Sequence, residues 1–128
     1  MCMRAQDARL PDAELEVMQA LWARKEYPAA SAELMEALAG RRWRMPTLLK
    51  LLSRLEERGF VAGSKDGRAN VYTPLVDQED YLARESRSFL KRVHGGSLSS
   101  LMVSLYPDAK LTQEDVAALE RILEKGAK

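Results

Sequence analysis

Residues 43–60 read WRMPTLLKLLSRLEERGF, and this stretch decides the fold because it predicts one helix with two different faces. Its apolar stripe follows the i, i+3, i+4, i+7 spacing of a helix packed on a core, and consists of Leu48, Leu51, Leu52 and Leu55. The opposite face carries Thr47, Lys50 and Arg54. Pro46 suits the first turn and Gly59 suits the position after the last turn, so both helix ends are encoded locally.

The polar face of this helix has two interpretations. A short row of cationic and hydrogen-bonding side chains, on a helix anchored by leucines, fits the major groove of DNA. An ordinary amphipathic helix with a solvated face would carry the same lysine and arginine. The helix by itself leaves both interpretations open, and the rest of the sequence has to decide between them.

The distribution of charge favours the first interpretation. The net charge of the chain is only +1, which by itself argues against a strong nucleic-acid binder. Residues 41–68, however, contain eight basic and three acidic side chains, a local net charge of +5, whereas residues 77–128 contain eight basic and nine acidic ones. The positive charge is therefore concentrated around the predicted helix, as a phosphate-binding surface requires.

Length and composition exclude several classes of protein. A chain of 128 residues suits one domain, or one small domain with an extension. The single cysteine, Cys2, allows neither an internal disulfide nor a cysteine metal cluster. The sequence has no apolar run near the roughly 18 residues that span a bilayer, and its start lacks the apolar segment of a signal peptide. We therefore expect a cytoplasmic protein with no cofactor, no metal and no membrane insertion.

Two helices are predicted before residue 43. The first runs from about residue 12 to residue 23, with Asp12 as its expected cap and an apolar face formed by Leu15, Val17, Met18, Leu21 and Trp22. Ala29-Ala30 leaves room for a short extended segment, and Ser31 is expected to cap the second helix. The second and third helices would then form a helix-turn-helix.

A β-hairpin is predicted directly after the third helix. Residues 60–62 and 69–73 are β-prone runs on either side of Asp66-Gly67, which is a strong hairpin signal. Lys65 and Arg68 lie at its tip, although an ordinary solvated turn would also carry such residues. Three helices followed by a basic hairpin describe a winged helix, so the predicted fold class is mainly α with a small β-hairpin.

The last third of the chain predicts three more amphipathic helices, at about residues 77–93, 98–105 and 112–123. Thr112-Gln113-Glu114-Asp115 resembles a capping box with Asp in place of Glu. Because the winged helix is already complete, we expect these helices to pack on a second copy of the chain, and the alternative is an intramolecular core. The expected interface residues are Tyr81, Leu82, Phe89, Val93, Leu101, Leu105, Leu119, Ile122 and Leu123. The expected organisation is a disordered tail over residues 1–9, a winged helix over 10–76 and a dimerisation region over 77–128.

Several segments in register resemble the penicillinase-repressor family (BlaI/MecI) of bacterial winged-helix repressors. The segments, which span about residues 10 to 123, are Leu10-Pro11-Asp12-Ala13-Glu14-Leu15-Glu16-Val17-Met18, Leu21-Trp22, Trp43, Thr47-Leu48, Leu51-Leu52-Ser53-Arg54-Leu55-Glu56-Glu57-Arg58-Gly59-Phe60, Tyr72, Gly95-Gly96 and Leu111-Thr112-Gln113-Glu114-Asp115. The resemblance implies a homodimeric repressor that binds a palindromic operator in double-stranded DNA through the helix at about residues 46–58 and the wing. The expected DNA-contacting residues are Arg42, Arg44, Thr47, Lys50, Arg54, Lys65 and Arg68.

The sequence also departs from the family pattern. Arg44, Leu49 and Lys50 stand where relatives often have shorter or polar residues, so the operator need not be the one that relatives bind. Leu49 could touch a thymine methyl group or pack on the hairpin. Relatives controlled by a membrane sensor-protease are cut at an Asn-Phe bond in the short helix. The nearest position here is Ser104-Leu105, which leaves the sensor-protease partner an open question. The cysteine cluster of the copper-responsive branch is absent from this sequence.

Two other functions compete with DNA binding. An enzyme needs a placed acid, base or nucleophile, and the only histidine, His94, precedes Gly95-Gly96 at a helix end, where it suits the helix dipole better than base catalysis. The sequence contains no phosphate-binding loop and no nucleophile elbow, so we expect no enzymatic activity. The closer alternative is a winged helix that binds another protein instead of DNA, and it would expose apolar or aromatic residues in place of Thr47, Lys50 and Arg54.

Overall fold

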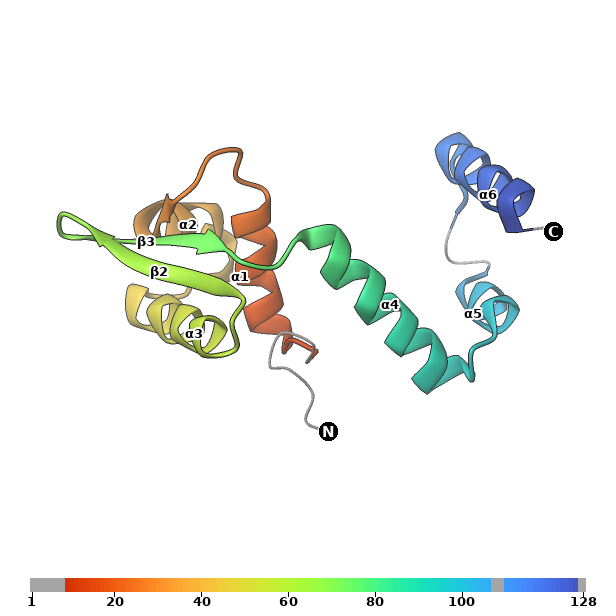
Figure 1. Cartoon of the computed structure of the whole chain (residues 1–128), viewed down its shortest axis with the longest axis horizontal. Coiled ribbons are helices and arrows are strands. Elements are labelled where there is room, and N and C mark those ends of the chain that lie inside the picture. Colours follow the sequence, from red (N-terminus) through yellow and green to blue (C-terminus); the bar gives the residue numbers. More distant parts are fainter. Residues whose placement is uncertain (1–8, 107–109, 127–128) are drawn as a thin grey trace. The chain divides into compact units, whose positions relative to one another are not determined.

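The computed structural model describes residues 9–106 and 110–126, which form two compact units that divide between Ser86 and Arg87. The first unit contains α1 (Asp12–Trp22), β1 (Ala29–Ala30), α2 (Ser31–Ala37), a short 3-10 helix (Ala39–Arg41) and α3 (Met45–Glu57). It continues with β2 (Val61–Asp66), β3 (Ala69–Pro74) and the first turns of α4 (Gln78–His94). The predicted fold class, mainly α with a β-hairpin wing, is confirmed (Figure 1).

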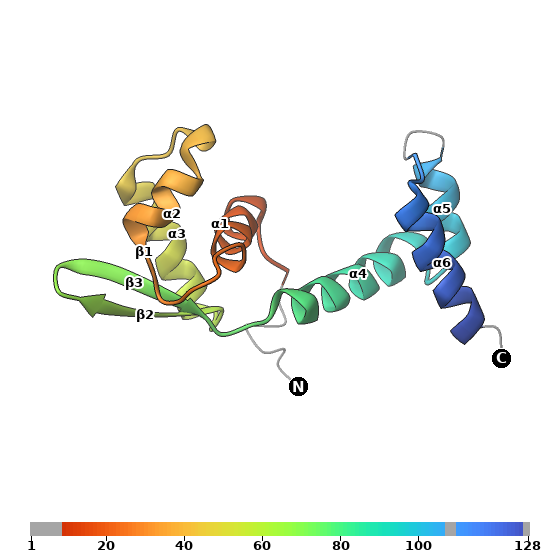
Figure 2. The same ribbon diagram turned by 90° about the horizontal axis from the view of Figure 1, so that it is seen from above.

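The three strands form one antiparallel sheet in the order β1-β3-β2, and the helices of the first unit cover one of its faces (Figure 2). Ala29 pairs with Tyr72, which adds the short β1 to the edge of the hairpin. Asp66 pairs with Ala69, so the hairpin loop consists of Gly67 and Arg68. Gly67 has φ +64°, a conformation that glycine adopts without the steric penalty of a side chain.

The apolar stripe of α3 packs into the core as the sequence predicts. Leu48, Leu52 and Leu55 are fully buried, while Leu51 is half-buried against them. They meet the buried face of α1, which is formed by Val17, Met18 and Leu21. Each fully buried leucine contributes about 1.5–3 kcal/mol relative to an exposed one, so this contact is a major source of the stability of the unit.

Two of the predicted helix caps are wrong and a third is confirmed. Asp12 and Ser31 are the first residues inside α1 and α2, and neither side chain caps its helix. The start of α2 is held instead by Glu33, whose Oε1 accepts a 2.9 Å hydrogen bond from the N–H of Ala30. Before α6, the N–H of Thr112 donates to Asp115 and the N–H of Asp115 donates to Thr112, both at 3.0 Å, which is the predicted capping box.

The first unit extends ten residues further than the predicted boundary at residue 76. Val76 and Tyr81 belong to its core, and the indole Nε1 of Trp22 donates a 2.9 Å hydrogen bond to the carbonyl oxygen of Val76. These contacts bring the first turns of α4 into the winged-helix unit. The predicted tail at residues 1–9 falls, except for Arg9, outside the described residues.

The second unit consists of the remainder of α4, α5 (Leu98–Leu105) and α6 (Gln113–Gly126), close to the three predicted helices. Ser97 caps α5 by accepting a 3.1 Å hydrogen bond from the N–H of Ser100. From Arg87 onward, no residue that the structure describes is buried. Among the described helices of the whole chain, none combines the length and hydropathy that crossing a membrane requires.

Candidate nucleic-acid interface

The outer face of α3 carries the three polar residues that the sequence analysis predicted there. Thr47, Lys50 and Arg54 are all exposed, and they follow one another at helical spacing on the side opposite the buried leucines. Leu49 is half-buried against the core, so part of its surface stays accessible. The helix therefore presents a hydrogen-bonding and cationic row with a rigid apolar backing.

Two arginines precede this helix. Arg44 occupies the N-cap position of α3 in an extended conformation, and Arg42 has φ +59° in the turn that follows the 3-10 helix. Both side chains are exposed. The turn thus places two cations at the entrance of the helix that carries Lys50 and Arg54.

The wing supplies two further cations. Lys65 lies on β2 opposite Asn70, and Arg68 lies in the two-residue loop beyond it. Both are exposed, and the hairpin tip extends past α3 in both views of the molecule (Figures 1 and 2). The β-hairpin is therefore positioned as a second cationic element next to α3.

Six of the eight basic residues between positions 41 and 68 have no acidic partner in the part of the chain that the structure describes. Within residues 9–106 and 110–126, no acidic side chain lies within 4.0 Å of the cationic groups of Arg42, Arg44, Lys50, Arg54, Lys65 or Arg68. The other two pair with carboxylates of α1: Arg41 with Glu16, and Arg58 with Glu14. The local charge of +5 in the sequence therefore overstates the number of cations that are free to meet a ligand, because it omits these α1 acids.

Close packing joins the end of α3 to the wing. A Cβ atom added at Gly63 on β2 would lie 2.9 Å from Oε1 of Glu56 and 3.1 Å from Cε1 of Tyr72, so a larger residue there would displace the side chain of Glu56 and press on the ring of Tyr72. Burial raises the pKa of Tyr72 above 10.0, and the nearby negative charge of Glu56 raises it further. The helix and the hairpin are thus held together as one surface.

Tyr81 is not available for the predicted dimer interface. It is only 4% exposed and lies in the core of the first unit, with its ring centroid 5.8 Å from those of Trp22 and Phe60. The sequence predicts Tyr81 beside the apolar stripe of α4 and assigns it to the interface, but contacts with Leu10, Trp22 and Phe60 bury this residue. The sequence contains one signal of this burial: Tyr81 is a large aromatic residue, and it is offset by one position from Leu82.

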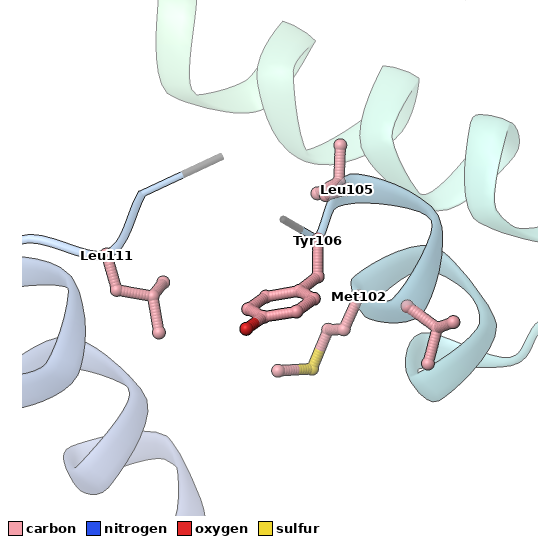
Figure 3. A pocket seen from close by; sticks show the side chains of 5 residues that line it. Met102, Leu105, Tyr106 and Leu111 are labelled. Carbon is pink, nitrogen blue, oxygen red and sulfur yellow. The ribbon is translucent and has the colours of Figure 1, made fainter. Parts of the chain in front are cut away.

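The other predicted interface residues are accessible. Leu101 and Leu119 are half-buried, whereas the exposed ones are Leu82, Phe89, Val93, Leu105, Ile122 and Leu123. Ser104 and Leu105, the possible cleavage position named from the sequence, are also exposed near the end of α5. In the second unit, Met102, Val103, Leu105, Tyr106 and Leu111 line an open apolar pocket between α5 and the start of α6 (Figure 3).

The described residues contain no group of three or more His, Cys, Asp or Glu side chains that could hold a metal ion. His94 lies at the end of α4, where its Nδ1 is 2.9 Å from Oγ of Ser100 and its ring contacts Phe89 at 5.6 Å. These are contacts within the helical unit, and they join the end of α4 to α5.

A helix-turn-helix, a three-stranded sheet and a basic hairpin define the class of this molecule as a winged-helix protein. Comparison with known proteins then identifies its family. The family model of the penicillinase repressor matches residues 10–125, and the chain belongs to that family.

Individual relatives agree with this assignment. The chain is 35% identical to the penicillinase repressor of Bacillus licheniformis, over 91% of each protein. It is 31% identical to the methicillin resistance regulatory protein MecI of Mammaliicoccus sciuri, over 91% of this chain and 94% of the relative. The solved DNA-binding domain of the repressor BlaI superposes with a TM-score of 0.50 at 34% identity, and covers 63% of this chain and 94% of that domain. These named relatives are repressors and a regulatory protein rather than enzymes.

Proposed function

We propose that this protein is a sequence-specific DNA-binding transcriptional repressor that binds a palindromic operator as a homodimer. In this proposal α3 enters the major groove, where Thr47, Lys50 and Arg54 face the base edges. Arg42 and Arg44 meet the backbone at the helix entrance, and Lys65 and Arg68 meet it beside the groove. The protein would act in the bacterial cytoplasm and needs no cofactor.

The observation that carries the proposal is the set of six cations on one helix, its entrance and the adjacent wing that have no acidic partner among the described residues. A cation that is free of an acidic partner can neutralise a phosphate and release its counterion, whereas a paired one must first lose its partner. The membership of the penicillinase repressor family, and the likeness to a domain that is described as DNA binding, support the same function.

A protein-binding winged helix fits these residues less well. Such a module would expose apolar or aromatic side chains on the outer face of α3, because the centre of a protein interface is depleted in charge. The exposed residues of α3 are Pro46, Thr47, Lys50, Ser53, Arg54, Glu56 and Glu57. None of them is aromatic or a large aliphatic residue, and the row of Thr47, Lys50 and Arg54 is hydrogen-bonding and cationic, which suits a polyanion better than an apolar protein surface.

Homodimer formation is proposed from the second unit. It exposes large apolar side chains on all three of its helices, including Val93 on α4, Leu105 on α5 and Ile122 on α6, and it buries none of its described residues. Amphipathic helices without a buried face need a partner to be stable. A second copy is the partner that also gives a two-fold arrangement of two reading helices, which a palindromic operator requires.

The experiment that tests the proposed function is selection of bound fragments from the source genome, followed by titration of the best fragment. Affinity should fall steeply with added salt, with a slope of log K against log salt of roughly −0.9 for each phosphate neutralised. A flat salt dependence, or selection of no common palindromic sequence, would exclude operator binding. Sedimentation of the free protein checks the dimer separately.

A membrane sensor-protease is a further proposed partner, which the family resemblance suggests for relief of repression. Ser104-Leu105 is exposed on α5, but it differs in both residues from the Asn-Phe bond of relatives. Mass spectrometry of the protein from induced cells would detect a cut at this bond, and an intact chain under induction would exclude cleavage as the signal.

A further inference from the structure

Glu14 occupies a position on α1 that an apolar residue would be expected to fill. It lies three, four and seven residues before Val17, Met18 and Leu21, which are the fully buried residues of that helix. Glu14 itself is only 1% exposed. The sequence presents it as a first-turn acid that favours the helix dipole, yet the structure turns it inward to the same face as the core residues.

The buried carboxylate of Glu14 meets the end of α3. Its Oε1 lies 3.0 Å from Nε of Arg58, the C-cap residue of α3, at ion-pair distance. The contact lacks the geometry of a hydrogen bond, and Oε1 has no hydrogen-bond partner among the described residues. The charge of Arg58 is therefore the compensation that the structure gives this oxygen.

A second carboxylate of α1 reaches the other end of α3. Glu16 pairs with Arg41, and the guanidinium of Arg41 lies 5.3 Å from the ring centroid of Trp43, just before α3 begins. Helix α1 is thus linked by charge to residues on both sides of α3, which starts at Met45 and ends at Glu57. These two arginines are the paired members of the basic segment.

The pair of Glu14 and Arg58 is a poor way to gain stability. Taking a carboxylate out of water is expensive, and replacing a buried ion pair by apolar residues of similar volume is often neutral or stabilising. An ion pair does, however, fix two groups at a defined distance, here Oε1 of Glu14 and Nε of Arg58, and buried ionic groups specify geometry in this way in some proteins. The pair therefore contributes to the position of α3, the helix that carries Lys50 and Arg54, more than to the free energy of unfolding.

We propose that Glu14, through Arg58, is a positioning residue that fixes where α3 lies against α1, so that the outer face of α3 meets base edges in one register. This inference rests on the proposed function. Glu14 would touch no DNA, and the arginine that it holds would be withdrawn from phosphate binding. Discrimination between DNA sequences, and not general affinity for DNA, is the property that depends on it.

The test compares the wild type with the double variant Glu14→Gln/Arg58→Gln, which removes both charges and leaves the net charge unchanged. Each protein is titrated with the genomic fragment that the wild type selects and with a scrambled fragment of equal length, at one salt concentration. We expect the ratio of the two Kd values to fall by about tenfold, as for one lost base contact, while the Kd for scrambled DNA stays the same. The matched control is Arg9→Gln/Glu85→Gln, an ion pair between a residue that precedes α1 and a residue of α4, which should leave the ratio unchanged.

An unchanged ratio in the Glu14 variant, or equal weakening on both fragments, would overturn the positioning role and leave Glu14 with a structural role only. If the double variant does not fold at the assay temperature, Arg58→Lys carries the test, because it keeps the charge but loses the planar guanidinium, and the same ratio decides the outcome. Failure of the wild type to prefer any fragment would instead refute the proposed function, and the positioning role with it.

Discussion

The hydroxyl oxygen of Tyr81 accepts a 3.0 Å hydrogen bond from the backbone N–H of Leu10, 71 residues earlier in the chain. Leu10 is buried at the start of α1, and the ring of Tyr81 also contacts Trp22 at the end of α1 and Phe60 just after α3. One side chain of α4 therefore connects both ends of α1 with the exit of α3. The first turns of α4 are part of the winged helix for this reason.

Replacing Tyr81 by Phe should lower the free energy of unfolding by about 1–3 kcal/mol, because the buried N–H of Leu10 would lose its acceptor while the ring contacts stay. Denaturant unfolding followed by circular dichroism measures this change. The matched control is Tyr106→Phe, since Tyr106 is 78% exposed, and its effect should lie within about 0.5 kcal/mol of zero. Equal effects of the two substitutions would contradict a stabilising role for the hydrogen bond.

The stability of the winged helix should decrease at alkaline pH. Burial raises the pKa of Tyr81 and of Tyr72 above 10.0, and Glu56 adds to the increase at Tyr72. The folded state therefore holds these protons more tightly than the unfolded state. The contribution of these two protonated tyrosines to the free energy of unfolding is complete below pH 10.0, and it is lost as the pH rises through their folded-state pKa values. Urea unfolding at a series of pH values should show this loss, and it should be smaller in the double variant Tyr72→Phe/Tyr81→Phe.

Substitutions on α3 and on the wing should affect DNA binding differently. Lys50→Ala should change which bases are preferred at one position of the operator, because a base-edge contact is worth about 1–3 kcal/mol of discrimination. Lys65→Ala and Arg68→Ala should weaken binding to all sequences alike and should each lower the salt slope by about 0.9. Binding-site selection and salt titration measure the two effects. A wing variant with an altered base preference would contradict this division.

Features that depend on local sequence were predictable. The leucine spacing of residues 48–55 defines the buried face of α3 whatever surrounds it, and Asp66-Gly67 encodes a hairpin within a few residues. The capping box at Thr112 and Asp115 is equally local, and the structure contains both of its hydrogen bonds. The exposed row of Thr47, Lys50 and Arg54 follows from the same periodicity, which is why the candidate interface could be named from the sequence.

Features that depend on distant partners were not predictable. Nothing in the local sequence indicates that Glu14 is buried, because Arg58, its partner, is 44 residues away. Arg41 and Arg58 were counted as available cations for the same reason. The sequence predicts Tyr81 for the dimer interface, and only its hydrogen bond to Leu10 and its contacts with Trp22 and Phe60 identify it as core. Local patterns give the faces of helices, but tertiary contacts decide which members of a face are covered.

The proposed dimer predicts the effect of a charge placed on α6. Ile122 is exposed in the second unit, and burying it against a second copy would remove its side chain from water. Ile122→Glu should therefore weaken self-association strongly, because a carboxylate in an apolar interface loses its hydration without gaining a partner. Sedimentation equilibrium should then give the mass of one chain at concentrations where the wild type gives that of two.

Gln113→Glu is the matched control, because it adds the same charge to the first turn of α6, where a negative charge suits the helix dipole. It should leave the measured mass unchanged. On DNA, Ile122→Glu should bind a palindromic fragment with lower affinity than the wild type, but a single half-site equally well, because the first unit keeps its α3 and wing. If Ile122→Glu remained dimeric, the dimer would have to form through another surface of the chain, and the exposed apolar residues of α6 would need a different partner.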